Sequence, residues 1–304
     1  MKAVPLFLTM TVVASGQYER PGSTDAQFLK IGVSARSAGM GGAYIAVVSG
    51  ADATFYNPAA LARIRGTAIA FNHTEWFAGI NHEFAAVART FGRLGTLGVS
   101  VTALYTDMME VRTPLQPDGT GETFFSGNLR VGISYSRFLT DRVTFGGTLN
   151  TITMSLYRGF MAQAYSADIS ILYTTLFRGF RFGMKIANFG SDVKFVNESY
   201  PLPTNFTFGL AVNAVELPDQ RLLVSFSAVK PNDGQPLGQA GTEWNYHDFL
   251  FLRAGYPLNH DVATSSFGGG IQLRLGGNLM NVDYAYSGFN LLGAAHRFGV
   301  RMNW

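Results

Sequence analysis

The stretch NFTFGLAVNA, residues 205–214, alternates large apolar side chains with small or polar ones. Phe206 and Phe208 fall on one face of an extended chain, and Thr207 and Gly209 fall on the other. This period of two is typical of a β-strand whose two faces meet different surroundings. The stretch therefore predicts a strand with one apolar face.

The same alternation recurs along the chain, for example in LRVGISYSR (129–137), FRFGMKIAN (180–188) and SFGGGIQLRL (266–275). In a soluble sandwich such apolar faces point inward and need cover, but no other part of this sequence is able to cover them. A closed transmembrane barrel needs none, because lipid meets the apolar face and a polar lumen meets the small and charged face.

The links between these segments alternate in length. Short links such as FGRLG and LTDR stand at every second position, and longer ones, such as 106–123 and 190–204, fall between them. This sorting is typical of bacterial outer-membrane barrels. We therefore predict an all-β fold, a 14-stranded antiparallel transmembrane β-barrel over residues 67–304. The expected strands span residues 67–74, 81–91, 95–106, 123–138, 142–155, 163–176, 179–188, 204–215, 220–229, 238–246, 248–256, 264–275, 278–287 and 294–303.

The composition agrees with a membrane setting. Hydrophobic residues make up 47% of the 304 residues and charged residues only 14%, against roughly 25% in soluble domains. Past the first residues no uninterrupted apolar run reaches about 18 residues, so a transmembrane helix is not expected. The net charge of +3 is small and scattered, which gives no electrostatic argument for nucleic-acid binding.

The first residues have the pattern of an export signal. Lys2 is followed by the apolar run AVPLFLTMTVVA and the small residues ASG, so we expect a signal peptide over residues 1–16, with a structural first strand as the alternative. The chain contains no cysteine, so no disulfide framework is expected to stabilise it after export.

Residues 17–66 mix apolar and small residues with a glycine cluster and an Asn-Pro turn, and their period-2 alternation is weak. A free tail would be poorer in apolar residues. We therefore expect a short N-terminal hatch or plug segment that packs against the barrel mouth or lumen. A detached linker is the alternative.

Within this segment, QFLKIGVSARSAGMGGAYIAV (27–47) followed by ATFYNPAALA (53–62) resembles the N-terminal signature of the PorV/PorQ family, relatives of the FadL-type long-chain fatty-acid transporters. A glycine motif and an Asn-Pro-Ala motif carry the resemblance. Their residues are Gly39, Met40, Gly41, Gly42, Asn57, Pro58 and Ala59.

The resemblance implies a FadL-like barrel in the outer membrane of a Bacteroidota-like bacterium, with both termini periplasmic. Characterised members serve the type IX secretion system, where they receive exported cargo through its C-terminal domain and pass it to a sortase. Cargo domains and a sortase are therefore implied partners, beside outer-membrane lipid.

The residues themselves suggest structural roles for both motifs. Asn57 can cap the turn that follows it while Pro58 fixes φ, and the glycines let the backbone pass close to the barrel wall. Direct contact with a ligand is the alternative.

The stretch HRFGVRMNW, residues 296–304, predicts the strand that closes the barrel. Phe298 and Trp304 are expected to face lipid, with Trp304 at the periplasmic interface. A terminal aromatic on such a strand resembles the signal read by the outer-membrane barrel assembly machinery, so we assign that role to these two residues. Trp76 and Phe77, near another strand end, are expected in an interfacial girdle.

Strand parity directs a set of polar residues into the lumen, as any barrel in lipid requires. A turn centred near residues 289–290 would place Asp283 opposite Arg297, where the pair would stiffen the wall. A basic lumen that guides an anionic solute is the alternative. The predicted luminal residues are Arg130, Asp168, Arg181, Lys185, Arg253, Gln272, Arg274, Asp283, Arg297 and Arg301.

Enzyme chemistry finds no support in the motifs. The sequence has no cysteine nucleophile, no GxSxG elbow and no HExxH pair. His73, His82, His247 and His260 are expected as solvated residues at strand ends or in loops rather than as metal ligands. We predict no catalytic residue, metal or cofactor.

Two functions fit these features. In the first, slightly favoured because the hatch is short, the outer loops at 115–123 and 193–203 bind type IX cargo or a partner protein. In the second, the barrel is a FadL-like channel whose hatch opens a path for a hydrophobic small molecule.

Overall fold

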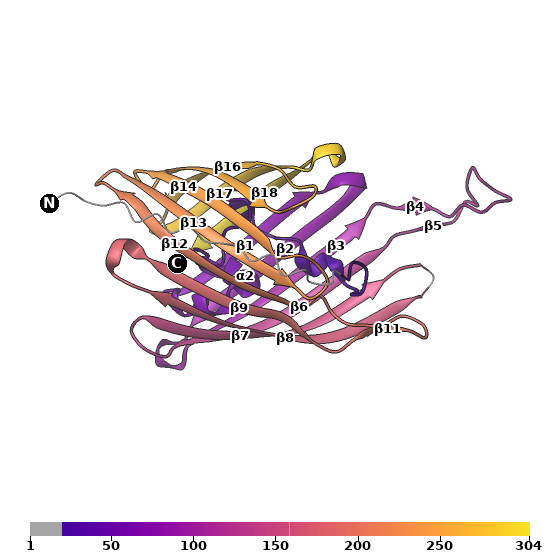
Figure 1. Cartoon of the computed structure of the whole chain (residues 1–304), viewed down its shortest axis with the longest axis horizontal. Helices are drawn as coiled ribbons and strands as arrows, with labels where there is room; N and C mark the ends of the chain where they lie inside the picture. Colours follow the sequence, from indigo (N-terminus) through magenta and orange to yellow (C-terminus); the bar gives the residue numbers. More distant parts are fainter. Residues whose placement is uncertain (1–19, 158) are drawn as a thin grey trace.

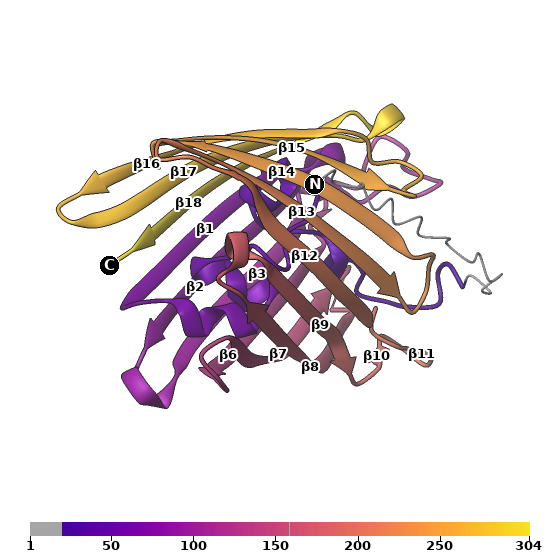
Figure 2. The ribbon, with the colours of Figure 1, turned by 60° about the vertical axis from the view of Figure 1, so that its left-hand side comes forward.

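The computed structural model describes residues 20–157 and 159–304, so the predicted signal peptide lies outside the described chain. Within those residues, fourteen strands close into one barrel in which every strand pairs antiparallel with its neighbours (Figures 1 and 2). The first and last barrel strands pair with each other from Ala68 with Asn303 to Glu75 with His296, which removes both sheet edges. The predicted all-β fold, a 14-stranded antiparallel barrel, is confirmed.

The barrel strands match the expected ranges closely. They are β1 (Thr67–Glu75), β2 (Ile80–Thr90), β3 (Thr96–Thr106), β6 (Gly127–Phe138), β7 (Val143–Ser155), β8 (Met161–Thr174), β9 (Arg181–Gly190), β12 (Asn205–Glu216), β13 (Gln220–Pro231), β14 (Leu237–Tyr246), β15 (Leu250–Leu258), β16 (Ser266–Leu275), β17 (Asn278–Gly288) and β18 (Ala294–Asn303).

Alternation along each strand sorts side chains between the two faces of the wall. Ile133, Leu149 and Tyr165 are 62%, 70% and 61% exposed, whereas Ser134 and Thr148 on the inner face are buried. The exposed apolar side chains occur on strands all around the barrel, so its outer surface is an apolar belt. A soluble barrel would have the reverse arrangement.

The two ends of the barrel differ. At one end, here called the turn end, the strands are joined by the links 91–95, 139–142, 175–180, 217–219, 247–249 and 276–277. The opposite loop end carries the longest links, 107–126 and 191–204. The first of these contains the hairpin β4 (Met109–Glu110) and β5 (Thr123–Phe124), which projects far beyond the wall (Figure 1). The second contains β10 (Val193–Lys194) and β11 (Ser199–Tyr200).

Residues 24–66, here called the luminal segment, fold inside the barrel. Their short elements are η1 (Gln27–Lys30), α1 (Ala35–Gly39), η2 (Gly50–Asp52), α2 (Ala53–Tyr56) and η3 (Pro58–Arg63). The other one-turn helices, η4 (Phe77–Gly79), η5 (Gly92–Leu94), η6 (Phe177–Gly179) and η7 (Asn290–Leu292), lie in the links between strands. No helix in the described ranges is long and apolar enough to cross a membrane.

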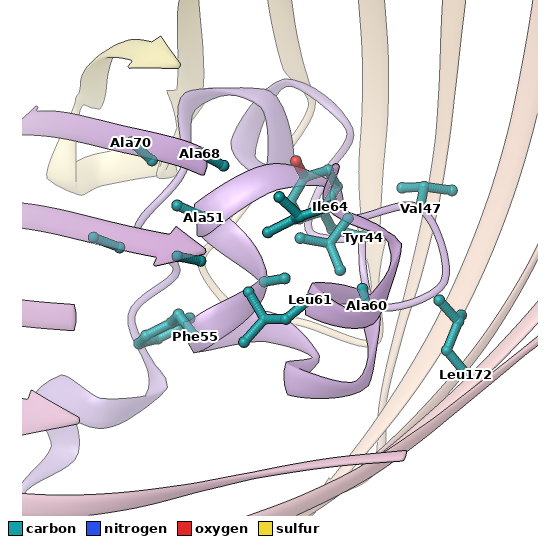
Figure 3. Close-up of a cluster of buried hydrophobic side chains, with 14 of the residues drawn as sticks. Tyr44, Val47, Ala51, Phe55, Ala60, Leu61, Ile64, Ala68, Ala70 and Leu172 are labelled. Atoms are coloured by element: carbon teal, nitrogen blue, oxygen red, sulfur yellow. The ribbon is translucent and has the colours of Figure 1, made fainter. Parts of the chain in front are cut away.

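The core of the molecule lies between the luminal segment and the inner wall. Tyr44, Phe55 and Leu61 of the segment pack with small wall residues such as Ala68 and Ala70 (Figure 3). Small residues on the inner face of β1 leave room for these side chains. Burial of each large apolar side chain contributes about 1.5–3 kcal/mol, so the segment is fixed in the lumen by ordinary core packing.

The luminal segment runs from the loop end to the turn end. The Asp25 amide donates to the Pro201 carbonyl in the link 191–204, whereas Thr67 and Trp304 pair at the turn end. The described chain therefore begins at the loop end and finishes at the turn end. Residues 24–30 are held by links at the loop end. That both termini are periplasmic stays a prediction.

Candidate functional site

A cavity of about 550 Å³ lies inside the barrel on the loop side of the luminal segment. We call it the loop-end cavity. Ile31, Ile45 and Phe55 of the segment form one part of its wall, and Val229 and Leu237 of the barrel form another. Its size and largely apolar lining fit the range of small-molecule sites, about 300–1,000 Å³.

An aromatic cluster at the loop end lines part of this cavity. The Trp76 ring lies 4.8 Å from Phe77 and 5.1 Å from Phe289, measured between ring centroids. All three side chains line the cavity. Trp76 and Phe77 therefore pack with Phe289 of the β17–β18 link beside the cavity. Their place in an interfacial girdle stays a prediction.

Arg297 supplies a cationic group at the cavity wall. Its side chain is buried, with the residue only 5% exposed, and lies 5.1 Å above the Trp76 ring. Arg297 Nη1 donates to Ser287 Oγ at 3.0 Å, whereas Nε has no hydrogen-bond acceptor. No carboxylate of the described chain forms an ion pair with it. An unpaired guanidinium at a desolvated site favours a ligand group that accepts hydrogen bonds.

Two further orphan polar groups flank Arg297 on the inner wall. Thr74 stands opposite both His82 and Arg297 in the strand register. Its hydroxyl and both ring nitrogens of His82 are buried without a partner. The prediction of a solvated His82 is wrong, because its parity on β2 directs it into the lumen, where it is 1% exposed.

A buried triad fixes the opposite wall. Asp168 accepts from Arg130 Nη2 at 2.9 Å and lies 2.9 Å from Lys185 Nζ. The Asn188 amide donates to the other Asp168 oxygen at 2.9 Å. The Arg130 and Lys185 cations lie 5.1 and 5.6 Å from the Phe55 ring, so the triad also positions a side chain of the cavity wall.

A second charged network joins the luminal segment to the wall near the turn end. Arg36 donates from Nε and Nη2 to Glu243 at 2.7 and 2.6 Å, and Arg253 Nε donates to Glu243 at 2.6 Å. Arg253 and Arg301 both bind Asp283, each at 2.7 Å. Although burial opposes its charge, the Glu243 carboxylate holds the pKa of Arg36 above its ordinary value.

This network corrects the predicted pairing of Asp283 with Arg297. Asp283 stands opposite Gly299, and Ala285 stands opposite Arg297. The link between β17 and β18 is centred on residue 291, whereas the predicted pair requires a centre at residue 290, so the register differs by two residues. A shift of two residues keeps each side chain on the same face of the wall but changes the residue that stands opposite it on the neighbouring strand.

Arg36 and Glu243 are absent from the predicted set. Glu243 carried a usable signal, since GQAGTEWNY (238–246) places it among small residues on the inner face of β14. Arg36 carried none, because its role depends on how the luminal segment docks.

The other predicted luminal charges lie near the turn end. Arg181 and Gln272 line a second cavity there, and both are half-buried. Arg274 shares the parity of Gln272 but is exposed near the end of β16. It joins no ion pair within the described part of the chain.

The glycine motif forms the tightest contact between segment and wall. Met40 is fully buried, and Cβ atoms added to Gly241 or Gly255 of the wall would overlap the backbone of Met40 or Gly41. A Cβ on Gly39 would lie 3.0 Å from Gly268 Cα. The wall and the segment thus approach backbone to backbone. Gly42 has a φ of 86° and faces Gln239.

The Asn-Pro-Ala motif anchors the other half of the segment. Asn57 Oδ1 accepts from the Ala59 amide at 3.2 Å and caps η3, and Asn57 Nδ2 donates to the Ile45 carbonyl at 2.9 Å. Pro58 and Ala59 lie against Gly146 of β7. Both motifs therefore occupy structural positions, although Gly41 and Gly42 also border the loop-end cavity.

The residues assigned to assembly lie on the last strand and just after it. Phe298 faces outward and packs with Tyr284 at 5.1 Å between ring centroids. The Trp304 amide donates to the Thr67 carbonyl at 3.0 Å at the turn end.

Comparison with known proteins identifies the family of this chain. A family model described as "Uncharacterised protein family (UPF0164)" matches residues 8–164, more than half of the chain. The chain belongs to the UPF0164 family. The PorV/PorQ assignment is not confirmed, and no curated protein matches this UPF0164 member.

Solved structures share the fold of this UPF0164 protein. The toluene transporter TodX of Pseudomonas putida aligns with a TM-score of 0.60 at 14% identity, covering 89% of this chain and 97% of that chain. The toluene transporter TbuX of Ralstonia pickettii gives 0.56 at 14% identity, with 88% and 96% covered. A Pseudomonas aeruginosa FadL homologue gives 0.53 at 8% identity, with 90% and 98% covered. The fold is thus a FadL-like barrel.

Proposed function

We propose that this UPF0164 protein is an outer-membrane channel for hydrophobic small molecules. The observation that carries the proposal is the loop-end cavity, an apolar space inside the wall with the unpaired Arg297 at its margin. The solved structures named as toluene transporters support it through their shared fold. A secreted barrel with an apolar belt suits the outer membrane, with the turn end toward the periplasm.

The lining suggests which hydrophobic molecules enter. The aromatic cluster and the aliphatic wall favour a chain or ring, whereas Arg297 favours one polar or acidic end group. Because the luminal segment separates the loop-end cavity from the turn end, passage requires that segment to shift. The loop-end cavity is then the first binding site on the path through the barrel.

Tryptophan quenching tests this proposal. Trp76 lines the cavity, so a chain with Trp244 and Trp304 replaced by phenylalanine reports occupancy there. We expect 11-bromoundecanoic acid to quench Trp76 saturably, and 1-bromoundecane to do so more weakly. Ala38→Leu, which fills the cavity, should weaken quenching about tenfold.

Ala103→Leu is the matched control, because Ala103 shares the outward parity of Val101 on β3. Its quenching curve should equal that of the parent. Quenching that is unsaturable, or equal in Ala38→Leu and the parent, would show that the cavity is no binding site.

A role in type IX secretion is the second candidate, and the β4–β5 hairpin favours it. Met108, Leu115 and Phe125 are exposed on this projecting link, where they are available to a protein partner. In the other loop, Val193 and Leu202 are buried with Phe28 and Leu29. Val196 and Tyr200 of the same loop are exposed, so part of 193–203 is also available for contact.

Gentle purification from native membranes, followed by mass spectrometry, separates the two candidates. Secreted proteins that share a C-terminal domain, lost when residues 108–125 are replaced by a short turn, would support secretion. A preparation containing bound lipid without such partners would count against it. Recognition of Phe298 and Trp304 by the assembly machinery stays a prediction from the sequence.

A further inference from the structure

A second cavity, of about 230 Å³, lies at the turn end of the lumen, on the other side of the luminal segment. We call it the turn-end cavity. Its walls come from the turn-end halves of β9, β12–β18 and from Arg36 and Ser49 of the luminal segment. It is polar, it is separate from the loop-end cavity, and the transport proposal makes no use of it.

The charges around this cavity do not balance. Its lining contains the arginines Arg36, Arg181, Arg221, Arg253 and Arg301. Four carboxyl groups of the described chain lie near them: Glu243 and Asp248 in the lining, Asp283, which binds Arg253 and Arg301, and Asp52, which interacts electrostatically with Arg301. The cavity therefore carries an excess of positive charge inside a low-dielectric wall, where a bound anion is attracted more strongly than in water.

Arg181 and Arg221 are the groups left available. Arg36, Arg253 and Arg301 are held by Glu243 and Asp283 at 2.6 to 2.7 Å. Arg221 makes only a loose contact with Asp248, at 3.8 Å, and both side chains are about half exposed. Arg181 is half-buried and has no ion-pair partner in residues 20–157 and 159–304.

We propose that the turn-end cavity binds a compact oxyanion, a phosphate or a small carboxylate, between Arg181 and Arg221. A guanidinium presents paired N–H groups that match the oxygens of phosphate and carboxylate. The volume admits such a group but not a long apolar chain. The wall of the barrel excludes membrane lipid, so the anion is water-soluble and enters from the turn end.

Equilibrium dialysis of the purified full-length chain against radiolabelled inorganic phosphate tests this site, with chloride holding the ionic strength constant. We expect saturable binding that is about tenfold weaker in Arg181→Gln and partly restored in Arg181→Lys. Arg142→Gln removes an exposed arginine from the neighbouring turn 139–142 and should bind phosphate as the parent does.

Each variant must first show the heat-modifiable gel migration of a folded barrel, and a variant that fails is replaced by Arg221→Gln. Equal phosphate affinity in Arg181→Gln and the parent would overturn the proposal. A lack of saturable binding up to about 10 mM phosphate would also overturn it, because a specific site of this charge should have a lower dissociation constant than that. Bromoundecanoate binding in the loop-end cavity should be unchanged in Arg181→Gln, which separates failure of this site from failure of the proposed channel.

Discussion

Individual glycines decide how closely the luminal segment approaches the wall. Gly41 has a φ of 62°, and a Cβ there would lie 2.6 Å from the Tyr256 amide nitrogen. The position therefore demands glycine for two reasons: the left-handed backbone conformation and the contact. The sequence marks the glycine motif, whereas its partners Gly241 and Gly255 follow only from how the segment docks on β14 and β15.

Gly41→Ala should lower the free energy of unfolding by about 2–4 kcal/mol, because the left-handed conformation costs about 1–2 kcal/mol and the overlap adds a packing cost. Gly92→Ala is the matched control, since Gly92 has a φ of 57° but open space where its Cβ would lie. It should cost only about 1–2 kcal/mol. Urea titrations of the heat-modifiable band would measure both, and equal losses would refute the contact argument.

At the scale of elements, the start of the luminal segment is tied to an outer link. Lys30 Nζ lies 2.5 Å from Asp233 in the link between β13 and β14, and Thr24 and Gln27 donate to the same carboxylate. Although burial opposes the charge, these hydrogen bonds lower the pKa of Asp233 to about 2. We call these four residues the latch.

The latch should open in acid. Because the folded pKa lies below the ordinary value of about 4, its contribution is present above about pH 4 and is lost as pH falls toward about 2. A spin label on Ser23→Cys reports this specifically, since the chain has no other cysteine. Label mobility should rise as the pH falls from about 4 to below about 2.

Asp233→Asn should leave the label mobile at every pH, whereas Asp261→Asn, an exposed residue of the neighbouring link, should not change its behaviour. A label whose mobility ignores both pH and Asp233→Asn would show that the latch holds nothing.

At the scale of the whole molecule, the lumen concentrates charge in a wall that is apolar outside. Arg130, Asp168 and Lys185 come from β6, β8 and β9 and are all buried. A buried ion cluster adds little net stability when complete, but removing one partner leaves uncompensated charge. The stability of the barrel therefore depends more on whether each charged network is complete than on how many networks it contains.

Asp168→Ala should lower the free energy of unfolding by about 3–5 kcal/mol, because two buried cations lose their shared counter-ion. Asp141→Ala, on an exposed turn, should change it by less than about 0.5 kcal/mol. Urea unfolding followed by tryptophan fluorescence would measure both. A loss in Asp168→Ala no larger than that in Asp141→Ala would mean that the cations are solvated in the native barrel.

The sequence by itself determined the barrel: strand count, strand ranges and the inward parity of Arg130, Asp168 and Lys185 follow from a period of two that lipid enforces locally. The tertiary structure alone decided which groups meet. Asp283 binds Arg301 and not Arg297 because a turn moved by one residue shifts the register by two. Arg36 reaches Glu243, 207 residues away, only because the luminal segment docks in the lumen. Both cavities lie in the parts of the lumen that the segment does not fill, and no local sequence pattern predicts where these are.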